Sequence, residues 1–299
     1  MTRIGKGRSL LLSLLLVPAF HSAALEIDAV FDFGNLGFAP DRVSSDTGFT
    51  GLDWLWGGSL ELAHQFSDNV EVRGGIYRDV VLRNVAYAMM YYKLDYFRMG
   101  FGIIQGVQNS ADTVLKPGIA SSVRVDVPGV VFASFLFDYS LGGSPVEVGD
   151  YLQSRSEFVL GFYAHNVICS LGVHSKKFVE QETAQQVVDD LVRYFFKADV
   201  FRKNSPYRLV FTFGYQSLQK KFLDGSASPP VHTLNSLLAG AELDVQVTRY
   251  LGLLLGLDAS VLTLGDDQLA GLRYPGPGGF LFTAHAGFSL NLAALKARL

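Results

Sequence analysis

Carboxylates at every second position are the feature of this sequence with the most chemical content. Glu242 and Asp244 stand between apolar residues late in the chain, and Glu26 and Asp28 do so near its start. Carboxylates gathered around a water-filled passage favour cations over anions. If the polar positions of this alternating pattern face such a passage, the sequence predicts these pore-lining residues: Glu26, Asp28, Asp32, Glu61, Glu71, Arg73, Arg124, Asp126, Arg193, Lys197, Asp199, Arg208, Glu242, Asp244, Asp258 and His285.

Signatures of enzymes and metal sites are scarce. No G-x-S-x-G, H-E-x-x-H, P-loop or G-x-G-x-x-G motif stands in a credible context. The spacing assigns no serine or acidic partner to His174 or His285, which a catalytic histidine requires. The single cysteine, Cys169, allows neither an internal disulfide nor a cysteine-based zinc site. We therefore predict no enzyme activity, no catalytic residues, no cofactor and no metal.

The alternation itself places the charged residues on β-strands. An amphipathic helix would repeat its apolar residues with a period of about 3.6, whereas these repeat with a period of 2. The first half of the chain is less regular, and in 84–93, 97–107 and 130–140 the sequence does not show which face would point inward. The clearest segments are 192–201, 207–216, 241–247, 250–261 and 281–292.

Residues 1–24 have the features of a secretory signal peptide. Three basic residues, Arg3, Lys6 and Arg8, precede the apolar run 9–20, and small residues at 22–24 predict cleavage after Ala24. An uncleaved anchor helix is the weaker alternative, because the apolar run is shorter than the roughly 20 residues that cross a bilayer. The remaining chain has 22 basic and 28 acidic residues, a net charge of −6. It lacks the basic cluster that nucleic-acid binding requires.

An exported chain that is apolar on average and has no long apolar run is best explained by a β-barrel. Its mean hydropathy is +0.24, and a closed barrel satisfies its backbone hydrogen bonds without helical spans. Tight turns are expected at 67–69, 94–96, 128–129, 165–166, 203–206 and 248–249. They alternate with longer connections at 34–54, 108–116, 141–154, 179–190, 220–233 and 264–277, and only 79–84 breaks this order. Residues 180–190 allow a short helix within such a loop.

Aromatic residues lie where the two interfaces of a membrane would be, and this favours a membrane barrel over a soluble one. A soluble barrel would have its apolar face inside, and the alternation alone does not decide between the two. We predict an all-β fold in which residues 25–299 form one closed transmembrane antiparallel barrel of about 14 strands, within a range of roughly 12 to 16. The expected interface residues are Tyr96, Phe97, Tyr207 and Tyr250 beside the tight turns, and Trp54, Trp56, Tyr77, Tyr139, Tyr151 and Tyr274 toward the long loops.

Closure of such a barrel would make its first and last strands neighbours. Glu26 and Asp28 would then lie beside the wall that carries Glu242, Asp244 and Asp258. This acidic excess predicts a weak preference for cations. The alternative is that the charges are paired and solvated inside a narrow or plugged barrel, with Arg124 and Asp126, and likewise Lys197 and Asp199, forming local pairs.

The predicted architecture resembles bacterial outer-membrane channels of the porin and fatty-acid-transporter kind over residues 25–299, without any signature motif. Fatty-acid transporters of similar strand count carry an N-terminal hatch that plugs the lumen. Here the first strand begins beside the predicted cleavage site, so no hatch is expected. Outer-membrane barrels commonly end on an aromatic residue, and this chain departs from that pattern by ending on Leu299.

The resemblance implies a protein of the outer membrane of a diderm bacterium, in contact with its lipid and with the barrel-assembly machinery. The expected function is passage of small solutes with a weak preference for cations. Uptake of hydrophobic molecules is one alternative, which a hydrophobic lumen or a hatch would favour. A closed, surface-exposed barrel is the other, acting as an adhesin or binding protein that contacts host molecules through long loops such as 34–54 and 220–233.

Overall fold

The computed structural model describes residues 25–35, 55–78, 82, 84–106, 117–141, 148, 150–181, 185–201, 205–223, 231–265 and 281–292. The predicted signal peptide and the loop aromatics Trp54 and Tyr274 lie outside these residues. The described strands are β1 (Leu25–Gly34), β2 (Leu55–Ser67), β3 (Val70–Arg78), β4 (Val85–Lys93), β5 (Phe97–Gly106), β6 (Gly118–Val127), β7 (Val131–Ser140), β8 (Tyr151–Ala164), β9 (Val167–Gln181), β10 (Gln186–Phe201), β11 (Tyr207–Leu223), β12 (Val231–Thr248), β13 (Leu251–Gly265) and β14 (Phe282–Asn291).

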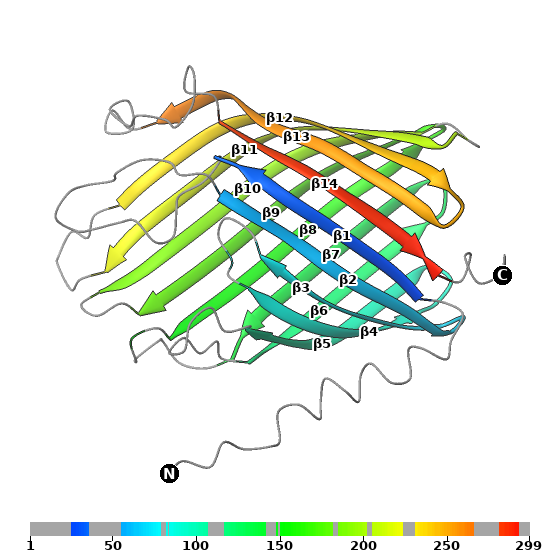
Figure 1. Ribbon diagram of the computed structural model, residues 1–299, viewed down its shortest axis with the longest axis horizontal. Coiled ribbons are helices and arrows are strands. Elements are labelled where there is room, and N and C mark those ends of the chain that lie inside the picture. Colours follow the sequence, from blue (N-terminus) through cyan, green and yellow to red (C-terminus); the bar gives the residue numbers. More distant parts are fainter. Residues whose placement is uncertain are drawn as a thin grey trace, which may run out of the picture.

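These 14 strands form one closed antiparallel barrel, as the sequence predicts. Each strand pairs with its neighbours in the chain, and the first strand closes the ring by pairing with the last, with Asp28 opposite Ser289 and Asp32 opposite His285. Figure 1 shows the strands running obliquely around the barrel, with β1 and β14 side by side. Closure satisfies the backbone hydrogen bonds that a free sheet edge would leave unpaired.

The outer face of the barrel is apolar. Residues opposite each other in antiparallel strands point to the same face of the sheet. Once the inner face of one strand is known, the pairing of residues identifies the inner face of every other strand. Phe101 of β5, Phe213 of β11 and Leu255 of β13 are exposed by 62, 55 and 59 %. An apolar exterior is stable where lipid rather than water surrounds it. The polar residues of the alternating pattern therefore point into the barrel.

The strands differ in length around the ring. Strands β8 to β13 have 14 to 18 residues, whereas β1, β3 to β7 and β14 have 9 or 10. About 9 to 11 residues of tilted strand cross the hydrocarbon core of a bilayer. The longer strands therefore continue past the membrane on the side of the long loops.

The polarity of the wall is reversed in this extension. Lys177 of β9, Asp190 of β10 and Lys221 of β11 lie on the outer face, and Lys221 Nζ is 3.2 Å from Asp190 Oδ2. On the inner face at the same end, Phe178 and Leu218 are buried. An outer surface with ion pairs and an inner surface of buried apolar residues is the pattern of a barrel wall in water.

Three of the predicted long connections are wrong in extent. Residues 179–190, expected as a loop with a short helix, are mostly strand: β9 continues to Gln181 and β10 begins at Gln186. The predicted loops 141–154 and 220–233 are also shorter than expected, because β8 begins at Tyr151, β11 continues to Leu223 and β12 begins at Val231. Residues 79–84 join β3 to β4, and residues 182–185 join β9 to β10, both on the side of the long loops, so that side also has short connections.

Gly34 controls the seam at which the barrel closes. A Cβ atom added there would lie 2.1 Å from the carbonyl oxygen of Phe282 and 2.7 Å from the Cα of Thr283, both backbone atoms of β14. Backbone atoms in a paired strand cannot rotate away, so we expect Gly34→Val to force the closing pair apart and to destabilise the barrel by about 1 to 3 kcal/mol or more. The measurement is the temperature at which the folded, compact form disappears in semi-native gel electrophoresis.

Gly74→Ala provides the control for this seam. The nearest atom to an added Cβ at Gly74 is the Tyr87 carbonyl oxygen at 3.3 Å, which a small shift accommodates. A Gly34→Val barrel with the same transition temperature as the control would show that the seam tolerates a side chain.

Candidate functional site

One continuous wall of the barrel carries seven inward carboxylates. It consists of β12, β13, β14, β1 and β2, which are neighbours in the ring. None of these five strands contains a lysine or an arginine. We call this surface the acidic wall, and its carboxylates are Glu26, Asp28, Asp32, Glu61, Glu242, Asp244 and Asp258. The predicted proximity of the N-terminal and C-terminal acids follows from the pairing of β1 with β14.

Cations from outside the acidic wall reach three of its carboxylates. Arg73 Nη1 of β3 lies 2.8 Å from Glu61 Oε1, and Arg193 Nη1 of β10 lies 3.1 Å from Asp258 Oδ2. Arg208 Nη1 of β11 approaches Asp244 Oδ2 only to 4.0 Å. The wall thus keeps more negative charge than these contacts neutralise.

Glycines on the inner face allow side chains to lie across neighbouring strands. His285 of β14 crosses β13 to place Nε2 3.3 Å from Glu242 Oε2 of β12. The strand between them has Gly256 at this point, where a Cβ atom would lie 1.9 Å from His285 Nε2. The absence of a side chain at Gly256 therefore makes room for the contact between His285 and Glu242.

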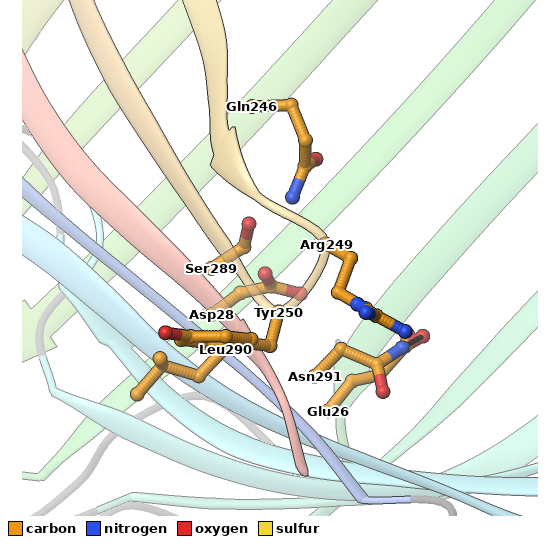
Figure 2. Close-up of a pocket in the computed structure, with 8 residues that line it drawn as sticks. All are labelled: Glu26, Asp28, Gln246, Arg249, Tyr250, Ser289, Leu290 and Asn291. Carbon is orange, nitrogen blue, oxygen red and sulfur yellow. Dashed lines mark hydrogen bonds between the residues drawn. The ribbon is translucent and has the colours of Figure 1, made fainter. Parts of the chain in front are cut away.

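The tight-turn end of the acidic wall contains a cavity of about 390 Å³. Figure 2 shows Glu26 and Asp28 of β1 around it, together with side chains from β14 and from the hairpin between β12 and β13. Asn291 Nδ2 donates a hydrogen bond of 3.0 Å to Glu26 Oε1. This volume falls within the range of small-molecule sites. The lining residues are Glu26, Asp28, Gln246, Arg249, Tyr250, Ser289, Leu290 and Asn291.

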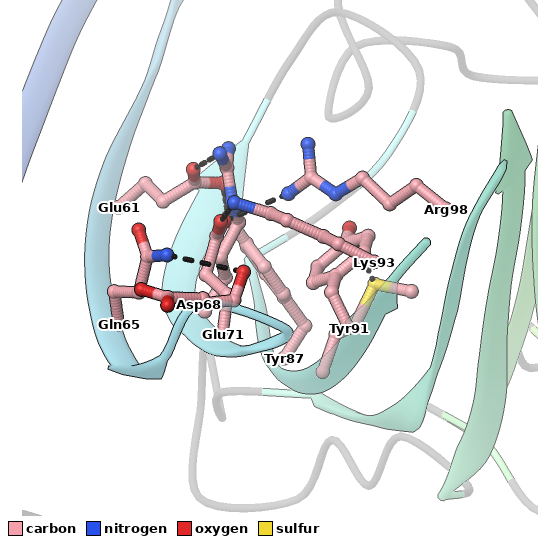
Figure 3. Close-up of polar contacts among 10 residues, drawn as sticks. Glu61, Gln65, Asp68, Glu71, Tyr87, Tyr91, Lys93 and Arg98 are labelled. Atoms are coloured by element: carbon pink, nitrogen blue, oxygen red, sulfur yellow. Dashed lines mark hydrogen bonds and ion pairs between the residues drawn. The ribbon is translucent and has the colours of Figure 1, made fainter. Parts of the chain in front are cut away.

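Glu71 is the centre of a second charged cluster, on β3 to β5 (Figure 3). Its buried carboxylate accepts hydrogen bonds or ion pairs from Arg73, from Lys93 and from Arg98 Nη2, the last at 2.7 Å. The Arg98 guanidinium lies 4.2 Å from the ring centroid of Tyr91. The cluster has more cations than anions, and it faces the same interior as the acidic wall. Lys93 and Arg98 are inner-face residues that the sequence pattern did not identify.

The remaining predicted lining residues form local contacts. Arg124 and Asp126 pair as expected, with Nη2 2.7 Å from Oδ2. The expected pair of Lys197 with Asp199 is replaced by a bidentate contact in which Arg208 Nε and Nη2 donate to Asp199 at 2.8 and 2.5 Å. Lys197 Nζ instead lies 5.0 Å from the centroid of the Phe195 ring.

The inner wall toward the long loops is largely apolar, which the sequence analysis did not predict. Ile104, Phe178 and Leu234 are buried there and belong to one connected cluster. Tyr77 and Tyr151, expected at the outer interface, are buried in the same cluster because each lies on the inner face of its strand. Trp56 and Tyr139 do lie outside, exposed by 56 and 43 %. The interior therefore has a charged half near the tight turns and, near the long loops, a half in which a buried apolar cluster surrounds a few polar residues such as Gln153 and Lys220; we call the latter the apolar half.

No helix in the described part of the chain is long and apolar enough to cross a membrane.

Known proteins resemble this chain in structure alone. No protein-family model and no curated protein sequence matches it. A bacterial polysaccharide outer membrane secretin is 9 % identical, with 89 % of this chain and 98 % of that one covered and a TM-score of 0.46. An outer membrane channel from Pseudomonas putida F1 is 9 % identical, with coverages of 89 and 95 % and a TM-score of 0.49. A porin is 6 % identical, with coverages of 89 and 98 % and a TM-score of 0.41.

These identities and TM-scores are too low to transfer a function from any of the three proteins. The fold rests on the chain's own geometry, a closed ring of 14 antiparallel strands with an apolar exterior. By this architecture, the chain is an outer-membrane type of β-barrel.

Proposed function

We propose that this chain is a channel of the bacterial outer membrane that passes small solutes and weakly prefers cations. The observation that carries the proposal is the acidic wall, which has seven inward carboxylates and no lysine or arginine on its five strands. Carboxylates along a passage lower the energy of a cation there and raise that of an anion. The apolar exterior supports the membrane location, and the predicted signal peptide provides the route of export.

The test is the reversal potential of single channels. Protein produced from the full chain and purified from membranes is inserted into a planar bilayer that separates two KCl concentrations. We expect discrete conductance steps and a reversal potential of the sign that cation preference gives. A folded, inserted protein whose reversal potential has the opposite sign would contradict the cation preference, and one without any conductance would contradict the channel.

Uptake of hydrophobic molecules is the second candidate function. The specific observation in its favour is the apolar composition of the inner wall near the long loops, where Phe178, Leu218 and Leu234 belong to one cluster. Such a surface suits an apolar ligand better than a hydrated ion. Saturable quenching of the protein's fluorescence by a brominated long-chain alkane in detergent micelles, together with an absence of ion conductance, would favour this candidate over the first.

Adhesion or other binding through the long loops remains a prediction, because most of residues 34–54 and 224–230 lie outside the described ranges. We also retain the proposal that the chain is not an enzyme. What supports it is the absence from the sequence of the enzyme motifs named above; the structure does give His285 an acidic partner, Glu242, which the spacing did not assign. Contacts with lipid and with the assembly machinery follow from the proposed location.

A further inference from the structure

A side-chain contact between described residues crosses the interior of the barrel. The guanidinium carbon of Arg155, on β8, lies 4.6 Å from the centroid of the Tyr77 ring, on β3. Four strands, β4 to β7, separate β8 from β3 along the wall. Both side chains lie on the inner face. A contact between strands so far apart in the ring has to pass through the lumen rather than along the wall.

The crossing side chain is fixed in place by its own strand pair. Arg155 Nε and Nη2 each lie 2.7 Å from Asp138 Oδ2 on the neighbouring strand β7. The carboxylate of Asp138 is almost fully buried. Charge-assisted hydrogen bonds of this length are among the stronger polar contacts in proteins. On the other side, the Tyr77 ring packs against Tyr87 of β4, with 6.0 Å between the ring centroids.

We propose that Tyr77 and Arg155 form the constriction that sets the size of solute the barrel passes. This inference rests on the proposed channel function and identifies the residues that determine its selectivity. The inner face around the crossing is closed to solvent, since Ile104 and Tyr151 are exposed by 1 and 0 %. An open, water-filled lumen at this level would leave such inward side chains exposed.

The polar groups buried at the constriction distinguish it from a permanent plug. Within the described residues, neither amide atom of the buried Gln153, which lies between Tyr151 and Arg155 on the inner face of β8, has a hydrogen-bond partner. A buried polar atom without a partner destabilises the state in which it is buried. Water that enters the lumen at this level would hydrate these groups. The favourable free energy of this hydration offsets part of the free energy that exposing the apolar side chains costs when the constriction opens.

The test compares two tyrosine substitutions on opposite faces of the barrel. Tyr77→Ala removes one side of the crossing, whereas Tyr139→Ala makes the same chemical change at an outward tyrosine that is 43 % exposed. Both proteins, and the wild type, are measured for single-channel conductance and for swelling of liposomes in sugars of graded size. We expect Tyr77→Ala to raise the conductance several-fold and to admit larger sugars, and Tyr139→Ala to match the wild type.

Arg155→Lys keeps the inference testable if Tyr77→Ala does not fold. A lysine retains the charge that Asp138 requires, but it replaces the planar guanidinium that lies over the ring, so we expect a smaller increase in the same direction. Folding of each variant is checked by its compact migration on unheated gels. If the wild type conducts and both inner variants have its conductance and size limit, the proposed constriction is wrong, but the proposed channel function is not. Folded wild type and variants that all fail to conduct would overturn both.

Discussion

The double variant Glu26→Gln, Asp28→Asn is expected to lose most of the channel's preference for cations. Both carboxylates lie on the inner face of β1 and line the cavity at the tight-turn end of the acidic wall. The carboxylates of Glu61 and Asp244 lie near enough to act electrostatically on Asp28. A permeating cation therefore meets their combined potential at this level, and neutralising two of them removes a large share of it.

The size of the effect follows from Coulomb's law. A unit charge about 5 Å from the path of an ion in water contributes about 0.8 kcal/mol. This corresponds to roughly a fourfold higher local concentration of a cation and a roughly fourfold lower local concentration of an anion for each carboxylate. Screening shortens the range of this potential to about 10 Å at 0.1 M salt, so the difference between variant and wild type should be largest in dilute KCl and small at 1 M.

The matched control is Asp68→Asn, Asp95→Asn. It removes the same charge from the same end of the barrel, but both residues are exposed in the tight turns rather than on the inner face of a strand. We expect its reversal potential to stay near the wild-type value. If the control and the inner variant shifted the reversal potential equally, net charge rather than the acidic wall would determine selectivity.

The alternation of side chains was enough to predict the closed barrel, its strand number and the tight turns. It was not enough where the polarity of the two faces changes within one strand. In β10, Tyr194 and Phe196 lie on the outer face, but closer to the long loops the buried apolar residues are Leu191 and Val187, on the inner face. The apolar residues thus change from the outer face to the inner face within one strand. This change interrupts their period of 2, so the sequence of this segment resembles that of a loop.

The lining residues were predictable only where one face of a strand is clearly polar. The acidic wall meets this condition. Strands β4 and β5 do not, because Tyr87, Met89 and Tyr91 are on the inner face beside Lys93. The contact between Arg155 and Tyr77 depends on the cross-section of the whole barrel, and no local pattern encodes it.

Lys220→Met is expected to be the most destabilising single substitution considered for the described part of the barrel, by about 3 to 5 kcal/mol. Lys220 Nζ lies 3.1 and 3.2 Å from the two carboxylate oxygens of Asp189, and the two side chains are exposed by only 1 and 9 %. Leu218 and Phe222, on either side of Lys220 on the same inner face, are buried. Removal of one member of a buried ion pair leaves the other charge without its counterion in a poorly solvated environment.

Lys221 provides the matched comparison for Lys220. It also pairs with an aspartate at 3.2 Å, but it lies on the outer face with its side chain 34 % exposed. Lys221→Met should cost no more than about 1 kcal/mol, since solvent screens an exposed pair. Guanidinium unfolding in lipid vesicles, followed by tryptophan fluorescence, measures both. The double variant Lys220→Met, Asp189→Leu should recover much of the stability, because well-packed apolar residues can replace a buried pair. Equal losses for Lys220→Met and Lys221→Met would instead place Lys220 in contact with water, and the apolar half of the interior would then be open.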